Sequence, residues 1–253
     1  MHADEDPPIK STAMSLDVVE TVHELGGATL PEIADRFQKP KSTVHDHLKT
    51  LTDAGYLVKE GRTFRVGIKF LNLGGHARSR KKLFQVAESE LRQLATDTGE
   101  HANLMTEEDG RGIFLYKLKG TQSVQLDTYE GMIVDLHTTA MGKAILAEYP
   151  EERRDAILAK HGLDPVTENT VTDRDELEAQ FEGIRERGYA IDDEERVDGV
   201  RCIAAPITTN EGVVGAVSVS GPKSRMNGER FEETIPSEVL STANIIEVNL
   251  QYS

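Results

Sequence analysis

The chain has 253 residues, enough for one large domain or two smaller ones, and for a buried core that needs no disulfide or metal. It contains 29 Lys and Arg against 44 Asp and Glu, and the net charge of −15, taken as an average, argues against nucleic acid or an anionic membrane as a partner. A single cysteine, Cys202, excludes an intramolecular disulfide, and the lack of any apolar stretch of about 20 residues argues against a membrane span.

The charge is distributed unevenly along the chain. Between Arg36 and Lys82 there are twelve basic residues and three acidic ones, a net charge of +9, whereas the remainder carries −24. A basic segment inside an acidic chain is typical of a surface that contacts phosphates. The average charge therefore hides a candidate DNA-binding region.

Three helices are predicted first in chain order. Residues 12–25 have the apolar spacing of an amphipathic helix. Thr29 and Glu32 have the spacing of a capping box at the start of a second helix, which ends near Phe37. A third helix is predicted over residues 41–54. Two short helices joined by a tight turn, the second polar and basic, indicate a helix-turn-helix.

A hairpin with a basic tip follows the third helix. Residues 56–58 and 63–66 are predicted as strands that flank a turn over residues 59–62. Together with the helices they predict a winged helix, whose wing would lie along the adjacent DNA backbone or minor groove. The candidate DNA-contacting residues, on the exposed face of the third helix and on the wing, are Lys41, Ser42, Thr43, His45, Asp46, Lys49 and Arg62.

Asp46 is unusual on this face, because its carboxylate repels phosphate. Two interpretations stand side by side. Asp46 can accept a hydrogen bond from cytosine N4 and so discriminate between sites, or it can pair with Lys49 or Ser42 and orient them.

A linker separates this region from the rest of the chain. Gly74 and Gly75 are predicted to mark the end of the first domain, and residues 76–98 are predicted as a helix. Basic residues at the N-terminus of a helix interact unfavourably with the helix dipole. The basic residues at the start of this helix therefore favour an external anionic partner.

The second domain is predicted to be α+β, with an antiparallel sheet and helices packed on it, as in a sensor domain. The strands are predicted at residues 102–105, 113–116, 123–126, 200–207 and 213–219, and the helices at residues 139–147, 151–160, 173–187 and 228–250.

Three groups of residues in this domain could bind a ligand. Residues 137–143 open a helix, which makes either an anion site or an ordinary capped helix. Residues 192–195 are four consecutive acids, for which a solvated loop is the default interpretation. Cys202, Ser218 and Ser220 place small polar groups on one side of their strands, as in a pocket for a small polar ligand.

Two alternatives involve chemistry at these residues. One is an enzyme with Cys202 as nucleophile and His101 or His137 as base. The other is a metal-dependent sensor that uses His101, His137 and Cys202 as ligands. A pure protein-interaction adaptor would leave the basic segment unexplained.

The chain resembles the IclR family of transcriptional regulators over roughly residues 12–250. The motifs that carry the resemblance are PKSTVH at residues 40–45, LHTTAMGKA at 136–144, GVRCIAAP at 199–206 and SVSG at 218–221. The resemblance implies a winged helix-turn-helix domain (12–75), a linker helix (76–98) and a GAF-like effector-binding domain (99–253). These would work as a homodimer or a dimer of dimers.

The resemblance also implies a function and a site. The expected protein is a cytoplasmic, sequence-specific regulator without catalytic residues, metal or cofactor, which binds a double-stranded DNA operator under control of a small-molecule effector, an organic acid or catabolic intermediate. The implied effector-binding positions are Ala140, Met141, Asp192, Cys202, Ser218 and Ser220.

The chain departs from the family pattern in two ways. The family commonly has Arg and Leu where this chain has Asp46 and His47, so operator contacts do not carry over. Some relatives have a tight Gly-rich helix start where this chain has the bulkier Ala140 and Met141, which are expected to shrink the pocket. The strongly acidic remainder of the chain, which has no Trp, suggests adaptation to a high-salt cytoplasm.

Overall fold

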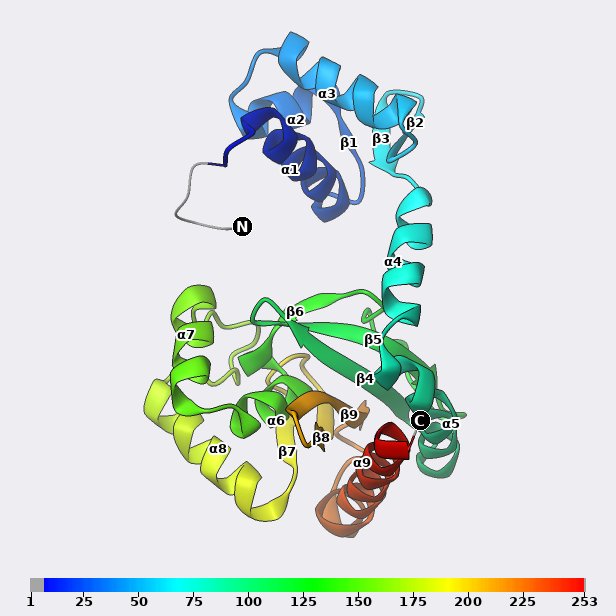
Figure 1. The fold of residues 1–253 in the computed structure, drawn as a ribbon, viewed down its shortest axis with the longest axis vertical. Helices are drawn as coiled ribbons and strands as arrows, with labels where there is room; N and C mark the ends of the chain where they lie inside the picture. Colours follow the sequence, from blue (N-terminus) through cyan, green and yellow to red (C-terminus); the bar gives the residue numbers. More distant parts are fainter. Residues whose placement is uncertain (1–6, 253) are drawn as a thin grey trace. The chain divides into compact units, whose positions relative to one another are not determined.

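The computed structural model describes residues 7–252. The chain forms two compact units that divide between Ala77 and Arg78 (Figure 1).

The N-terminal unit is a winged helix, as predicted. Its elements are α1 (Lys10–Glu24), β1 (Ala28–Thr29), α2 (Leu30–Phe37), α3 (Lys41–Asp53), β2 (Leu57–Glu60) and β3 (Thr63–Val66). The strands form one antiparallel sheet in the order β1-β3-β2. Val18, Ile33 and Leu48, one from each helix, are fully buried in a common core.

Local sequence signals explain where these helices begin and end. The carboxylate of Glu32 accepts hydrogen bonds from the backbone N–H and the hydroxyl of Thr29, each at 2.7 Å, which confirms the predicted pairing at the start of α2. Gly55 has φ +77° just after α3, a conformation that favours glycine and turns the chain into the hairpin.

The linker differs from the predicted single helix. Helix α4 (Lys69–Ser79) runs through Gly74 and Gly75, and the chain turns instead at residues 80–81, before α5 (Lys82–Thr98). Glycine weakens a helix by about 1 kcal/mol without preventing its backbone hydrogen bonds, so two glycines do not force a break. No residue of α4 is buried.

The C-terminal unit is built on a six-stranded antiparallel sheet, which confirms the predicted fold class. The strands are β4 (His101–Glu108), β5 (Arg111–Lys119), β6 (Ile133–Asp135), β7 (Ala190–Asp193), β8 (Val200–Thr209) and β9 (Gly212–Pro222), in the order β6-β5-β4-β9-β8-β7. The central pair, β4 and β9, joins the beginning of the domain to its later part.

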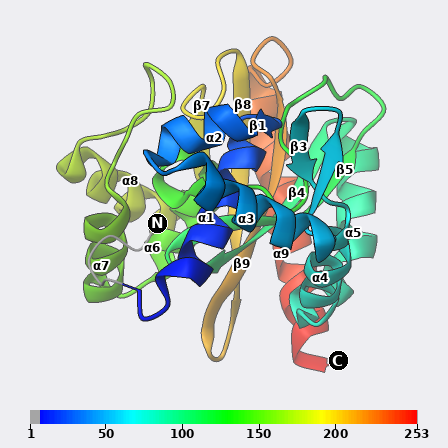
Figure 2. The same ribbon diagram turned by 90° about the horizontal axis from the view of Figure 1, so that it is seen from above.

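Helices cover both faces of this sheet (Figures 1 and 2). One face carries α6 (Ala140–Glu148), α7 (Glu151–His161) and α8 (Arg174–Arg187), which share a core with β4, β5 and β8. The other face carries α5 and α9 (Ile235–Tyr252). The candidate effector residues lie on the face that α6 covers.

One predicted strand needs correction, and one strand of the sheet was not predicted. Residues 123–126 are not a strand, because the carbonyls of Val124 and Leu126 bond the side chains of His101 and Lys117 instead of a neighbouring strand. The short β6, which was not predicted, takes the edge position beside β5. The last helix begins at residue 228, as predicted, but it contains a π-helical turn (Arg230–Thr234) before α9.

Candidate functional site

The candidate DNA-contacting side chains share an exposed surface of the N-terminal unit. Lys41, Ser42, Thr43, His45, Asp46 and Lys49 are all exposed on α3. Val44, Leu48 and Leu51 are buried on the opposite side of the helix, which explains this orientation.

The wing adds a second basic element to this surface. Arg62 lies in the two-residue turn between β2 and β3, beside Gly61 at φ +62°. Together with His45 of α3 and Lys59 of β2, Arg62 lines a groove of about 460 Å³. Helix α3 therefore contributes a histidine, and the wing two cations, to one groove, and the wing cations suit contact with a phosphate backbone.

The two residues that depart from the family pattern have different surroundings. Asp46 is 82% exposed, and its carboxylate lies 3.6 Å from Nδ1 of His45 rather than against Lys49 or Ser42. His47 Nδ1 is 2.8 Å from the hydroxyl of Ser15 and ties α3 to α1. Of the two, only Asp46 is free to face DNA.

A small cavity in the C-terminal unit brings together four of the six predicted effector residues. Met141, Asp192, Cys202 and Ser220 line a volume of about 40 Å³. Ala140 and Ser218 are completely buried but do not line it. Thr139, from the candidate group 137–143, also lines it, and the lining residues that were not predicted are Asn103, Phe114, Leu126, Thr128, Arg196, Val197 and Val200.

A chain of hydrogen bonds orders the polar wall of the cavity. Asn103 Nδ2 donates to the hydroxyls of Ser218 and Ser220, each at 3.2 Å, and the Ser220 hydroxyl lies 3.1 Å from Cys202 Sγ. In the sequence, Asn103 stands out as the single amide side chain within the predicted apolar strand 102–105.

Asp192 is the carboxylate of this cavity, and its burial overturns the default interpretation of residues 192–195 as a solvated loop. It is only 5% exposed, and Oδ1 accepts a hydrogen bond from the backbone N–H of Glu195 at 2.8 Å. Burial, and next the charge of Glu195, raise the pKa of Asp192 to about 7.

A buried ion pair lies beside Asp192. Lys143 of α6 donates to both carboxylate oxygens of Glu195 at 2.6 Å and to Gln180 of α8 at 2.9 Å. Burial outweighs this pairing and raises the pKa of Glu195.

The remaining charged side chain of the cavity is Arg196. Its Nε is buried and has no hydrogen-bond partner among the described residues. A buried guanidinium donor without a partner costs free energy unless a ligand or water satisfies it.

The start of α6 is an ordinary capped helix. The side chain of Thr139 accepts a hydrogen bond from the backbone N–H of Gly142 at 2.9 Å. A Cβ on Gly142 would lie 2.1 Å from the carbonyl oxygen of Leu136, so only glycine fits there. Of the two interpretations of residues 137–143, the capped helix is the one that these bonds support.

The residues of the catalytic and metal-binding alternatives are not suitably arranged. Burial raises the pKa of the Cys202 thiol to about 12, whereas a nucleophilic cysteine needs a lowered pKa. His101 and His137 are bonded through Nε2 to the carbonyls of Val124 and Asp164, and burial lowers both pKa values. Within residues 7–252, no three His, Cys, Asp or Glu side chains could hold a metal ion together.

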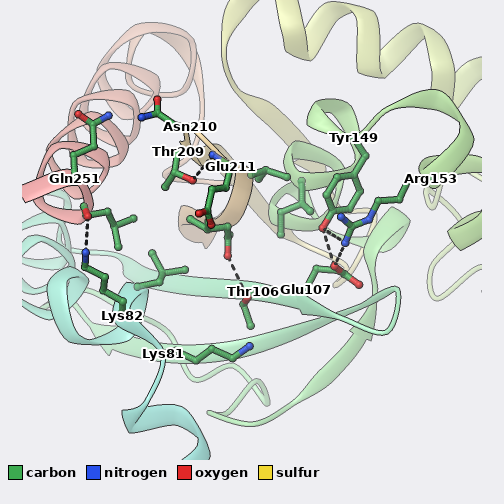
Figure 3. Close-up of a pocket in the computed structure, with 16 residues that line it drawn as sticks. Lys81, Lys82, Thr106, Glu107, Tyr149, Arg153, Thr209, Asn210, Glu211 and Gln251 are labelled. Carbon is green, nitrogen blue, oxygen red and sulfur yellow. Dashed lines mark hydrogen bonds and ion pairs between the residues drawn. The ribbon is translucent and has the colours of Figure 1, made fainter. Parts of the chain in front are cut away.

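A larger and more open pocket of about 630 Å³ lies elsewhere in the C-terminal unit (Figure 3). At one end Glu107 accepts hydrogen bonds from Tyr149 and Arg153, each at 2.7 Å. At the other end Lys82 donates to the carbonyl of Leu250 at 2.8 Å. Glu107 and Lys82 thus already have hydrogen-bond partners within the chain, in contrast to Nε of Arg196.

Two family models match the chain. The model for the C-terminal domain of the bacterial transcriptional regulator IclR matches residues 75–248, and the IclR helix-turn-helix domain matches residues 12–61. No helix in residues 7–252 is long and apolar enough to cross a membrane.

Similar proteins agree with these matches. A probable HTH-type transcriptional regulator ArcR of Halobacterium salinarum is 36% identical and covers 96% of this chain and 94% of the relative. The IclR structure of Thermotoga maritima has a TM-score of 0.73 at 30% identity, over 96% of this chain and 98% of that one. An IclR homologue of Microbacterium hydrocarbonoxydans, solved with 4-hydroxybenzoate, has a TM-score of 0.74 at 25% identity, over 90% and 92%.

Proposed function

Because the chain belongs to the IclR family of transcriptional regulators, we propose that it binds its operator through α3 and the wing, and that a small organic acid in the cavity beside Arg196 regulates this binding. The observation that carries the DNA-binding half is the groove that His45, Lys59 and Arg62 line together. Ser42, His45, Asp46 and Lys49 would contact bases, and Lys41 and Thr43 would contact the backbone.

Asp46 is proposed to contact a cytosine rather than to orient its neighbours. Its high exposure, and the position of its carboxylate near His45, support this choice. An Asp46→Asn variant should bind unrelated DNA more tightly and distinguish operator from mutated sites less well, by about 1–3 kcal/mol for the affected base pair.

Binding of the purified chain to genomic fragments tests the DNA-binding half. Fragments recovered at graded salt concentrations are sequenced, and fluorescence anisotropy then gives affinities for the enriched site. A shared sequence motif is expected. Binding that is equally weak for all sequences at every salt concentration would contradict the proposal. A Ser42→Ala, His45→Ala double variant is the control, because it keeps the nonspecific attraction of the basic residues for DNA.

The effector is proposed to be a carboxylate of two or three carbons. The cavity has room for about three waters, and it is lined by Ser220 and by Arg196, whose Nε has no hydrogen-bond partner among the described residues. The expected result is that acetate, lactate or pyruvate raises the melting temperature and benzoate does not. Arg196→Ala should abolish the shift, whereas Arg92→Ala, on the exposed side of α5, should not. Stabilisation by benzoate alone would contradict the assigned size.

The chain is proposed to act as a homodimer or a dimer of dimers. Ile68 and Leu71, at the linker, are 84% and 66% exposed, and α4 buries none of its own residues, which leaves an apolar surface for a second copy. Two copies would place two recognition helices in successive major grooves. Light scattering should give at least twice the monomer mass, and Leu71→Glu should lower it; a monomer at all concentrations would contradict the proposal.

The site of action is proposed to be a cytoplasm of high salt concentration. A hydrated acidic surface would keep the chain soluble there, and charge screening, with a Debye length of about 3 Å at 1 M, would make base contacts more important than phosphate contacts. Operator affinity should therefore change little between about 1 and 2 M salt. A steep fall over that range would contradict the idea.

A further inference from the structure

The segment at residues 126–130 touches two places that the proposed regulation must connect. Leu126 and Thr128 line the small cavity. Glu130, two residues further on, forms an ion pair with Arg78 in the last turn of α4. A few residues therefore join the wall of the cavity to the end of the linker helix.

Lys117 of β5 holds the cavity end of this segment. Its half-buried ammonium donates to the carbonyl of Leu126 at 3.2 Å, and to the carbonyl and hydroxyl of Thr128 at 2.8 and 2.6 Å. Three bonds from one side chain fix the position of both lining residues, in a segment with no strand hydrogen bonds of its own.

Arg78 holds the other end against the sheet. Its guanidinium lies 4.6 Å from the ring centre of Phe84 on α5 and 5.9 Å from that of Tyr116 on β5, and it also donates to the carbonyl of Leu115 at 3.3 Å. The side chain is 29% exposed. A guanidinium stacked on rings and paired with a carboxylate has one preferred position, so displacement of Glu130 would displace the last turn of α4.

We propose that residues 126–130 couple occupancy of the cavity to the linker helix, with Lys117 as the positioning residue at the cavity and the Glu130–Arg78 ion pair as the connection to α4. A ligand that moves Thr128 moves Glu130 and with it the end of the helix on which the DNA-binding unit is carried. The inference rests on the proposed effector function for its purpose, but its test requires neither ligand nor DNA.

The test measures the mobility of α4 directly. Ala77 is exposed one residue before Arg78, and Ala77→Cys places a reactive thiol there, while the buried Cys202 stays unlabelled. Fluorescence anisotropy of a dye at residue 77 is compared in the parent, Lys117→Met, Glu130→Gln and the combined variant. Lys117→Met is expected to lower the anisotropy, and this change is expected to shrink to about a third or less in the Glu130→Gln background.

Two results would overturn the proposal. One is that Lys117→Met lowers the anisotropy equally in the parent and in the Glu130→Gln background. The other is that neither Lys117→Met nor Glu130→Gln changes the anisotropy. Thr128→Val replaces Lys117→Met if melting curves show that the latter does not fold.

Glu108→Gln is the matched control. It removes the ion pair of Glu108 with Lys81, at the turn after α4, without touching the segment. The anisotropy is expected to stay at the parent value. A fall equal to that of Glu130→Gln would show that any lost charge near the linker loosens the helix, and would also overturn the proposal.

Discussion

The ammonium of Lys143 lies 2.6 Å from both carboxylate oxygens of Glu195, and the two side chains are 1% and 8% exposed. Because the partners come from α6 and from the loop after β7, their pairing fixes the acidic loop against the helix that borders the cavity. Removal of either partner leaves the other charge buried without compensation.

Substitution at this pair should therefore be costly. Lys143→Met or Glu195→Gln is expected to lower the free energy of unfolding by about 3–5 kcal/mol. The combined Lys143→Met, Glu195→Gln variant should lose less than the sum of the single variants, because neither charge of the pair remains buried. Denaturant titration measures all three. Arg92→Ala, which removes an exposed ion pair with Glu88, should cost less than about 1 kcal/mol. A cost as large as that of Lys143→Met would refute the role of burial.

Titration of Asp192 should make the free energy of unfolding fall as the pH rises. Burial, followed by the charge of Glu195, raises the pKa of Asp192 from an ordinary 3.8 to about 7. Between those values the folded chain holds a proton that the unfolded chain has released, so the free energy of unfolding falls as pH rises through this window and levels off above it.

Asp192→Asn provides the comparison. The amide oxygen can still accept from the backbone N–H of Glu195, but it does not titrate. Melting temperatures of parent and variant between pH 4 and pH 8 should diverge as pH rises toward about 7, with the variant the more stable. Parallel curves for the two proteins would show that Asp192 stays ionised throughout.

Local signals in the sequence predicted much of the fold, and distant contacts account for the rest. The Thr29 and Glu32 pairing involves residues three apart, and it is found as predicted. The acidic loop resembles a solvated loop in the sequence because its compensating cation, Lys143, lies about fifty residues away.

The missed elements have similar causes. The three residues of β6 are too few to show an alternation, and their strand is defined only by its pairing with β5. Arg196 gave no signal as a cavity residue, because a basic residue next to four acids resembles a solvated loop. Only the fold brings it to Cys202 and Ser220.

Arg62 should contribute to DNA affinity without contributing to sequence preference. It is exposed at the wing tip, so Arg62→Ala should weaken binding to all sequences alike. The slope of log affinity against log salt should fall in magnitude by about 0.9 for one lost phosphate contact. Anisotropy titrations over a salt series measure the slope. Altered preference for one base pair with an unchanged slope would instead place Arg62 on a base.

Cys202 should be chemically inert in the folded chain. Burial raises the pKa of its thiol to about 12, so almost no thiolate is present at neutral pH. A thiol reagent such as a dinitrobenzoate disulfide should react slowly with the native protein and rapidly in denaturant. Cys202→Ala should leave DNA binding intact. Rapid labelling of the native chain would contradict this prediction and would support Cys202 as a nucleophile.

The pairing of β4 with β9 at the centre of the sheet has a consequence for synthesis of the chain. Residues 101–108 leave the ribosome more than a hundred residues before their central partner at 212–222. The N-terminal unit, whose contacts are local, can fold meanwhile, whereas the sheet cannot close until translation is nearly complete. A nascent chain thus folds its DNA-binding N-terminal unit before its C-terminal unit. A truncated product would keep the N-terminal unit without a folded C-terminal unit.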